Sequence, residues 1–205
     1  MNKKEKARFI EKKLNEYFPH PKIFLLHKDP YTLLIAVLLS AQSTDAMVNK
    51  ITPLLFRKAD TPKKMIATGE EKIKKIIRPC GLYRKKAKAI VSLSKKLLEQ
   101  FKGKVPKEIK KLETLPGIGH KSASVVVSQA FNIPSFPVDT HIHRLAKRWK
   151  LTNGKNEKQT EKDLKRIFPK NKWGKIHLQM IAFGRKFCKA QSHKKEKCPI
   201  CKSLG

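Results

Sequence analysis

The chain has 205 residues, and 48 Lys and Arg against 16 Asp and Glu give it a formal net charge of +32. Its 40% of hydrophobic residues is enough for a packed core, which excludes an intrinsically disordered polycation. So large an excess of positive charge is disfavoured unless a polyanion compensates it, and nucleic-acid phosphates are the commonest such partner. The alternative is a lysine-rich surface that only keeps the protein in solution.

We expect neither a membrane-spanning helix nor a signal peptide in this sequence. Its longest apolar run is Leu33 to Leu39, well short of the roughly 18 residues that a span requires. Residues 1–6 are mostly charged and lead into an amphipathic pattern, whereas a signal peptide continues as an apolar stretch. We expect an intracellular protein, in the cytoplasm or nucleoid of a bacterium.

Apolar residues recur at intervals of three and four along most of the chain, for example within residues 9–18 and 90–98. This period is typical of helices, and no stretch alternates with the period of a strand. Pro and Gly separate the helical segments. The pattern predicts an all-α fold of roughly ten helices, with breaks at residues 19–21, 30, 62, 79–81, 106, 116–119, 134–137, 154 and 169.

The segment from Leu112 to Val127 predicts a short helix, a tight turn and a second, apolar helix. The turn, Pro116 to Gly119, has two glycines around one aliphatic residue, so its backbone can approach another molecule closely. The N–H groups at the start of the second helix, together with the helix dipole, form an anion site. Such a site binds a phosphate without reading a base. On a chain this basic we expect it to bind a DNA backbone; an ordinary helical corner is the alternative.

Two residues near this turn suggest chemistry. Lys121 is predicted in the first turn of the second helix, where the dipole disfavours an ammonium and favours a nucleophilic amine. Asp139 follows a Pro-rich turn at a predicted helix start. Lys121 could be one surface lysine of many, and Asp139 or Thr140 a plain N-cap. Near a bound phosphodiester, however, an amine and a carboxylate suit a reaction at a sugar carbon.

These residues resemble the helix–hairpin–helix DNA glycosylases, most closely the endonuclease III branch. The resemblance runs through nearly the whole chain, in the family's order and spacing. It rests on Leu33 to Asp45, Gly81-Leu82-Tyr83, Leu115 to Lys121, Val138 to His141 and Phe183-Gly184-Arg185.

The resemblance implies a bifunctional base-excision-repair enzyme that removes oxidised pyrimidines from duplex DNA and nicks the strand 3′ of the abasic site. Lys121 matches the family's nucleophile, and Asp139 matches its essential carboxylate. The presence of Lys at position 121 argues for lyase activity, since a monofunctional adenine glycosylase of the superfamily would lack it. A damaged base must be flipped out of the duplex to be excised.

Further residues match positions that contact DNA in the family. Gln42 would fill the space left by the flipped nucleotide, and Leu82 would wedge the opposite strand. Alternatively, Gln42 could be a polar residue that ends an apolar helix, and Leu82 could be a buried residue in a glycine turn. The remaining expected contacts come from Leu115, Gly117, Gly119 and His141.

The cysteines depart from the family pattern. The family often ends in four cysteines that hold a [4Fe–4S] cluster, with six, two and five residues between successive ligands. Here nine residues separate Cys188 from Cys198, two separate Cys198 from Cys201, and a fourth cysteine is missing. Cys80 is a poor substitute because it adjoins Gly81. The options are an incomplete iron–sulfur site, a Cys₃His zinc site with His193, or a metal-free remnant; the chemistry needs no metal.

The resemblance also implies the domain organisation. We expect a six-helix domain over residues 22–132, and a second helical domain made of residues 1–21 and 133–205, with the active cleft between them. We expect a monomer that binds damaged double-stranded DNA and does not bind membranes. Two rival functions are a non-catalytic helix–hairpin–helix DNA-binding module and a glycosylase specific for mismatched thymine or oxidised purines.

Overall fold

The computed structural model describes residues 1–204, and all regular structure in this range is helical. The predicted all-α class is therefore confirmed. The helices form two compact units. The hairpin unit is Ile23–Ile133, and the terminal unit joins Met1–Lys22 to Pro134–Gly205. Among the described residues, no helix is both long and apolar enough to cross a membrane.

The hairpin unit contains seven α-helices, one more than expected. Gly69 adopts a φ of 77° between α4 and α5, which splits one helical stretch into two. The helices are α2 (Pro30–Ser40), α3 (Asp45–Lys58), α4 (Pro62–Thr68), α5 (Glu70–Ile77), α6 (Tyr83–Phe101), α7 (Ile109–Glu113) and α8 (His120–Phe131).

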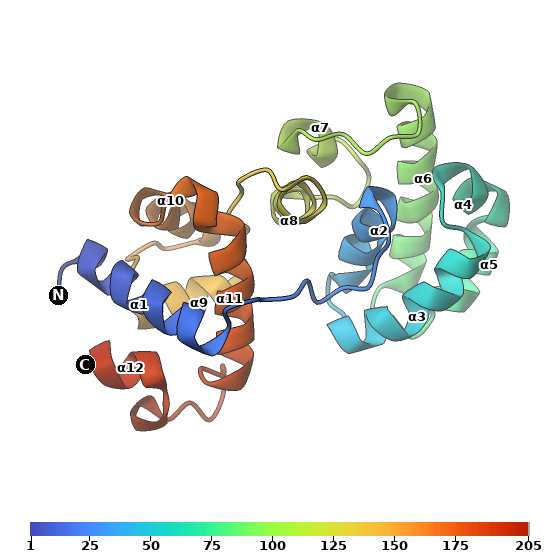
Figure 1. Cartoon of the computed structure of the whole chain (residues 1–205). Coiled ribbons are helices and arrows are strands. Elements are labelled where there is room, and N and C mark those ends of the chain that lie inside the picture. The colour runs from blue at the N-terminus through green and yellow to red at the C-terminus, as the bar shows by residue number, and fades with distance from the viewer. Residues whose placement is uncertain (205) are drawn as a thin grey trace. The chain divides into compact units, whose positions relative to one another are not determined.

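Helix α2 is the centre of the hairpin unit. Asp29 caps its N-terminus in a capping box with Thr32, and Pro30 occupies the first turn, where a missing N–H costs nothing. The nine residues Tyr31 to Leu39 are all buried. A helix that is apolar on every side must be surrounded. It packs against α3, α6 and α8, as Figure 1 shows.

The terminal unit combines the first helix with the second half of the chain. Its helices are α1 (Lys3–Tyr17), α9 (Thr140–Arg148), α10 (Glu157–Ile167), α11 (Trp173–Lys186) and α12 (Pro199–Leu204), with 3₁₀ turns at Lys170–Lys172 and Lys195–Lys197.

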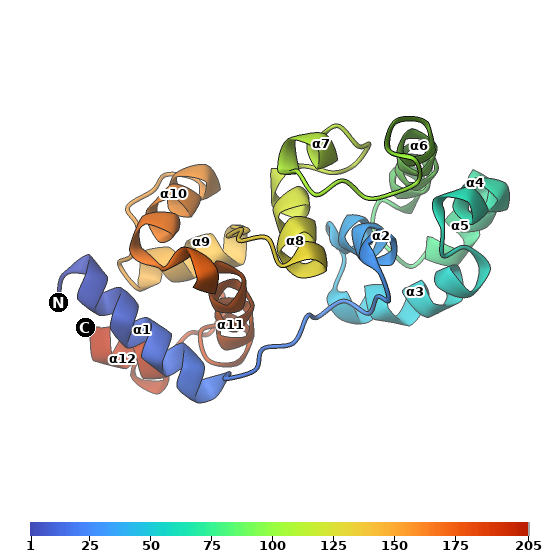
Figure 2. The same ribbon diagram turned by 45° about the horizontal axis from the view of Figure 1, so that its top comes forward.

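Helix α1 packs against α11, α10 and α12, and its contact with α11 and α12 is visible in both Figure 1 and Figure 2. Its apolar stripe buries Ile10 and Leu14. Trp149 and Phe183 are fully buried in the same core, with ring centroids 5.6 Å apart in an edge-to-face contact. The N-terminal helix is thus an integral part of this unit.

Candidate functional site

The turn between α7 and α8 leaves its backbone accessible at Gly119, and its apolar residues anchor it in the core. Gly117 has a φ of 81°, and a Cβ at this position would lie 3.1 Å from both Ala89 Cβ and Leu38 Cδ1. Ile118 is buried beside it. Gly119 is the N-cap of α8 and has no side chain to cap it, and a Cβ there would meet nothing within 4 Å. The start of α8 is therefore open to an approaching anion.

Leu115, which begins the hairpin segment, has a buried side chain. Its N–H donates to the Leu112 carbonyl at 2.9 Å, and its own carbonyl accepts from the Ile118 N–H at 3.1 Å. Leu115 thus anchors the turn in the core, so any contact that it makes with DNA would come from its backbone.

Lys121 is the second residue of α8 and is exposed. It follows the hairpin directly, in the first turn of α8, where the sequence predicts it.

Asp139 is the N-cap of α9 in the terminal unit. Its Oδ1 accepts the N–H of Ile142 at 2.8 Å, so the N-cap alternative is correct as a structural role. The preceding loop is fixed, because His177 Nδ1 lies 2.9 Å from the Pro137 carbonyl and Phe136 is buried against Phe168. The cap and the loop hold the carboxylate in a defined position.

His141 is exposed in the first turn of α9. Its Nδ1 lies 3.1 Å from the guanidinium of Arg144. It therefore shares the N-terminal end of α9 with Asp139.

Gln42 and Leu82 lie in two turns that touch each other in the hairpin unit. Both are non-glycine residues in the left-handed region, with φ of 52° and 59°. A Cβ on Gly81 would lie 2.8 Å from the Gln42 carbonyl oxygen, so only glycine permits this approach. Leu82 is 49% exposed, which excludes the alternative of a buried residue in a glycine turn.

Lys86, which no sequence motif indicates, joins these two turns. Its buried ammonium donates to the Leu39 carbonyl at 2.9 Å and to Ser43 Oγ at 3.0 Å. Ser43 Oγ also accepts the N–H of Gly81 at 3.2 Å. Burial lowers the pKa of Lys86. The available signal was its position on the buried stripe of α6, four residues before Ile90.

A loop in the terminal unit gathers Cys188, His193, Cys198 and Cys201. Their potential ligand atoms all lie within 4.8 Å of one another, and the three cysteines are buried. Hydrogen bonds from Cys188 and Cys201 lower the pKa of the Cys198 thiol, and contacts among the thiols raise the pKa of Cys188 and Cys201. The group is compatible with a metal site. Cys80 is buried in the other unit.

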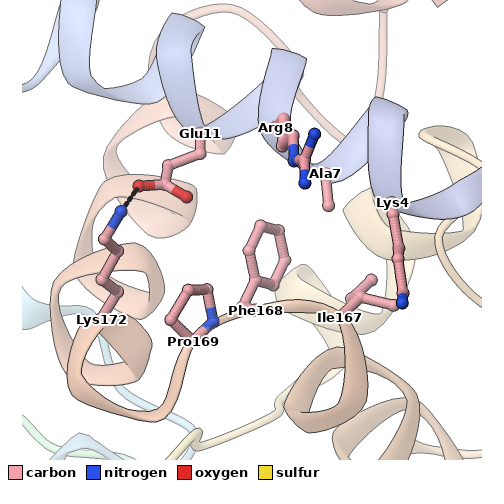
Figure 3. A pocket seen from close by; sticks show the side chains of 8 residues that line it. All are labelled: Lys4, Ala7, Arg8, Glu11, Ile167, Phe168, Pro169 and Lys172. Atoms are coloured by element: carbon pink, nitrogen blue, oxygen red, sulfur yellow. Dashed lines mark hydrogen bonds and ion pairs between the residues drawn. The ribbon is translucent and has the colours of Figure 1, made fainter.

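A separate pocket of about 310 Å³ lies between α1 and the loop after α10. Figure 3 shows the side chains that line it. Lys172 pairs with Glu11 at its edge, and Lys4, Arg8 and Phe168 contribute to the lining. The lining contains none of the residues singled out from the sequence.

The hairpin unit thus holds Gln42, Leu82 and Lys121, and the terminal unit holds Asp139, His141 and the cysteine loop. Comparisons with known proteins agree with the fold and the motifs. The family model of HhH-GPD superfamily base excision DNA repair proteins matches residues 35–170. Endonuclease III of Bacillus subtilis (strain 168) is 44% identical over 193 residues, which cover 94% of this chain and 88% of the relative.

Two solved structures superpose on nearly the whole chain. One is a non-covalent Endonuclease III–DNA complex, and the other is a trapped covalent Endonuclease III–DNA intermediate. Each has a TM-score of 0.93 and 43% identity, and each match covers 98% of this chain and 94% of the solved chain.

Proposed function

The chain belongs to the HhH-GPD superfamily of base excision DNA repair proteins, and from that premise we propose how its residues act on DNA. It is a bifunctional DNA N-glycosylase and abasic-site lyase of the Endonuclease III type. Its substrate is double-stranded DNA that carries an oxidised pyrimidine or an abasic site. The observation that carries the residue assignment is the position of Lys121 directly after the Gly117–Gly119 hairpin.

Lys121 is the nucleophile of the proposed reaction. Its neutral amine attacks C1′ of the deoxyribose, the bond from C1′ to the base breaks, and the base leaves with the bonding electrons and takes up a proton. The amine loses a proton, the C1′–O4′ bond then breaks with a proton going to O4′, and the ring opening turns the C1′–N bond into a Schiff base. Loss of a proton from C2′ and cleavage of the C3′–O bond release the 3′ phosphate. The covalent DNA intermediate of the Endonuclease III relative supports this route.

Asp139 supplies the carboxylate of the proposed reaction. Positive charge develops on the sugar as the base departs, and a carboxylate held in place stabilises it without reorganising. The bond from the Ile142 N–H to Oδ1 fixes the side chain. The same group can accept a proton from the attacking amine.

Gln42 and Leu82 keep the target nucleotide out of the stack. Leu82 is an exposed apolar side chain on a rigid turn, which suits insertion between bases. Gln42 lies in the adjoining turn, and its amide can hydrogen-bond the base left without a partner. Gly117 and Gly119 hold the phosphate backbone through N–H groups, and His141 contacts DNA from α9.

Borohydride trapping on duplex DNA containing thymine glycol tests the Lys121 assignment, because the reagent reduces the Schiff base to a stable adduct. We expect the wild-type chain to be trapped and Lys121→Ala to give no adduct. Lys63→Ala, which removes an exposed lysine of α4, is the matched control and should be trapped normally. An undiminished adduct in Lys121→Ala would remove this residue from its role.

Asp139→Asn separates catalysis from capping. Asn caps helices about as well as Asp, so the variant should remain folded. We expect strand cleavage to fall by about 10²-fold or more. Asp29→Asn, at the N-cap of α2, makes the same chemical change away from the reaction and should cleave like wild type. Unchanged cleavage in Asp139→Asn would favour the non-catalytic DNA-binding module.

A further inference from the structure

The cysteine loop contains an unpaired imidazole nitrogen next to three thiols. His193 Nε2 is buried and has no hydrogen-bond partner among residues 1–204. A buried polar atom without a partner is costly and rare in a folded protein. A ligand atom of His193 also lies within 4.8 Å of each cysteine sulfur, so the ring can bind one metal ion together with the three thiols.

The size of the group distinguishes one metal ion from an iron–sulfur cluster. Cys188 Sγ and Cys201 Sγ are 3.9 Å apart. Two sulfurs bound tetrahedrally to one zinc at about 2.3 Å lie about 3.8 Å from each other. In a [4Fe–4S] cluster each thiolate binds a different iron, which spreads the sulfurs to roughly 6 Å. The separation limit of 4.8 Å fits a single ion and is too small for the cluster.

The positions of the ligands lead to the same conclusion. Counted from Cys188, the family's spacing of six residues falls on Lys195, whereas the Cys198–Cys201 pair keeps the family's spacing of two. The position of the second cluster ligand therefore holds a side chain that does not ligate iron. His193 instead comes together with the three cysteines. A decayed site would not be expected to bring a new ligand to the same point.

Arg148 supports the site from outside. Its guanidinium donates to Cys188 Sγ at 3.5 Å and to the carbonyls of Lys189 and Ala190 at 2.6 and 3.1 Å. Three thiolates and one divalent ion leave a net charge of −1, which this cation offsets. Hydrogen bonds to ligating atoms of this kind fix the geometry of metal sites.

We propose that Cys188, His193, Cys198 and Cys201 bind one zinc ion in a mononuclear Cys₃His site, in place of the family's [4Fe–4S] cluster. All four positions come from the protein, so the site is closed and structural. Neither Lys121 nor Asp139 belongs to it.

Metal content under conditions that favour iron tests this proposal. The full chain is expressed in iron-replete medium and purified anaerobically without chelators, and its metals are measured by mass spectrometry. We expect one zinc per chain, only trace iron, and no broad absorption near roughly 400 nm. Four irons per chain with that absorption would overturn the proposal. So would a metal-free protein that also fails to bind added Co²⁺ or Zn²⁺.

Substitution of His193 tests the ligand set. His193→Ala should lose zinc to a competing chelator at least about tenfold faster than wild type, whereas His20→Ala, an exposed histidine outside the loop, should not. Retention at the wild-type rate would exclude the imidazole. His193→Cys preserves four ligands and should keep the metal. Its Co²⁺ form should show visible bands shifted from those of the wild type, and unshifted bands would also exclude His193.

Discussion

Lys86 joins the turns that carry Gln42 and Leu82, the two residues that we propose enter the duplex, and we expect it to position them. Its ammonium joins the end of α2 to Ser43, and Ser43 holds Gly81. Without this link, only the Gly81 N–H to Ser43 Oγ bond and the close approach of Gly81 to Gln42 would join the two turns. A displacement of about 1 Å at such positions can cost on the order of 10²-fold in rate.

Lys86→Met tests this role while it preserves the length of the side chain. We expect single-turnover excision of thymine glycol to slow by about tenfold or more. Binding to undamaged duplex should change little, because the hairpin is untouched. Lys85→Met removes the same charge from an exposed neighbour and should excise like wild type. Equal excision rates for the two variants would show that the link has no part in positioning.

The two glycines of the hairpin have different functions, and this can be tested at the level of the element. Gly117→Ala places a Cβ at positive φ and within 3.1 Å of Ala89 and Leu38. We expect it to lower the free energy of unfolding by about 1–2 kcal/mol or more in urea titrations.

Gly119→Ala should affect binding more than folding. Its φ of −96° suits alanine, and no atom lies within 4 Å of the new Cβ. We expect the free energy of unfolding to change by less than about 1 kcal/mol, since alanine is only a weaker N-cap than glycine. Affinity for duplex DNA, measured by fluorescence anisotropy, should fall because the methyl group occupies the path of the phosphate. Wild-type affinity would contradict backbone binding at this hairpin.

The elements of the fold were largely predictable because they depend on local patterns. Apolar periodicity predicted helices, and Pro and Gly predicted their ends. The turn at Leu82 was not predictable, because Gly81 suggests that the glycine itself takes the positive φ. In the structure Leu82 takes it, and Gly81 is needed for its close approach to Gln42. Lys86 bonds to Leu39 and Ser43, which lie 47 and 43 positions before it in the chain, so no local pattern reveals these contacts.

The hairpin turn was predictable from its glycines. Gly117 takes a φ of 81°, which favours glycine, and Gly119, at −96°, leaves the start of α8 uncovered. The metal site depends on tertiary convergence, since the distances among Cys188, His193 and Cys201 are set by how the loop folds back. The sequence therefore left the iron–sulfur, zinc and metal-free options open.

At the scale of the whole molecule, the charge of +32 should make DNA search strongly dependent on salt. A protein that neutralises six to ten phosphates loses about 10³- to 10⁵-fold in affinity between 50 and 200 mM salt. We expect a loss in this range for undamaged duplex, measured by anisotropy. The single-turnover rate of the saturated complex should change much less, because the chemistry uses short-range groups. If the rate fell with salt as steeply as the affinity, the chemistry would depend on the same long-range charge as binding, which would contradict this prediction.

The discontinuous terminal unit also affects how the chain folds as it is synthesised. Asn15, the residue after the buried Leu14 of α1, accepts a hydrogen bond from Gln179, which lies 164 residues later in the chain. At 5–20 residues per second, a ribosome needs roughly 10–30 s to make that interval. Ile10 and Leu14 therefore lack their native partners while the continuous hairpin unit is completed. Helix α1 therefore waits for α10, α11 and α12 before its apolar stripe is buried, although it is synthesised before every other helix of the two units.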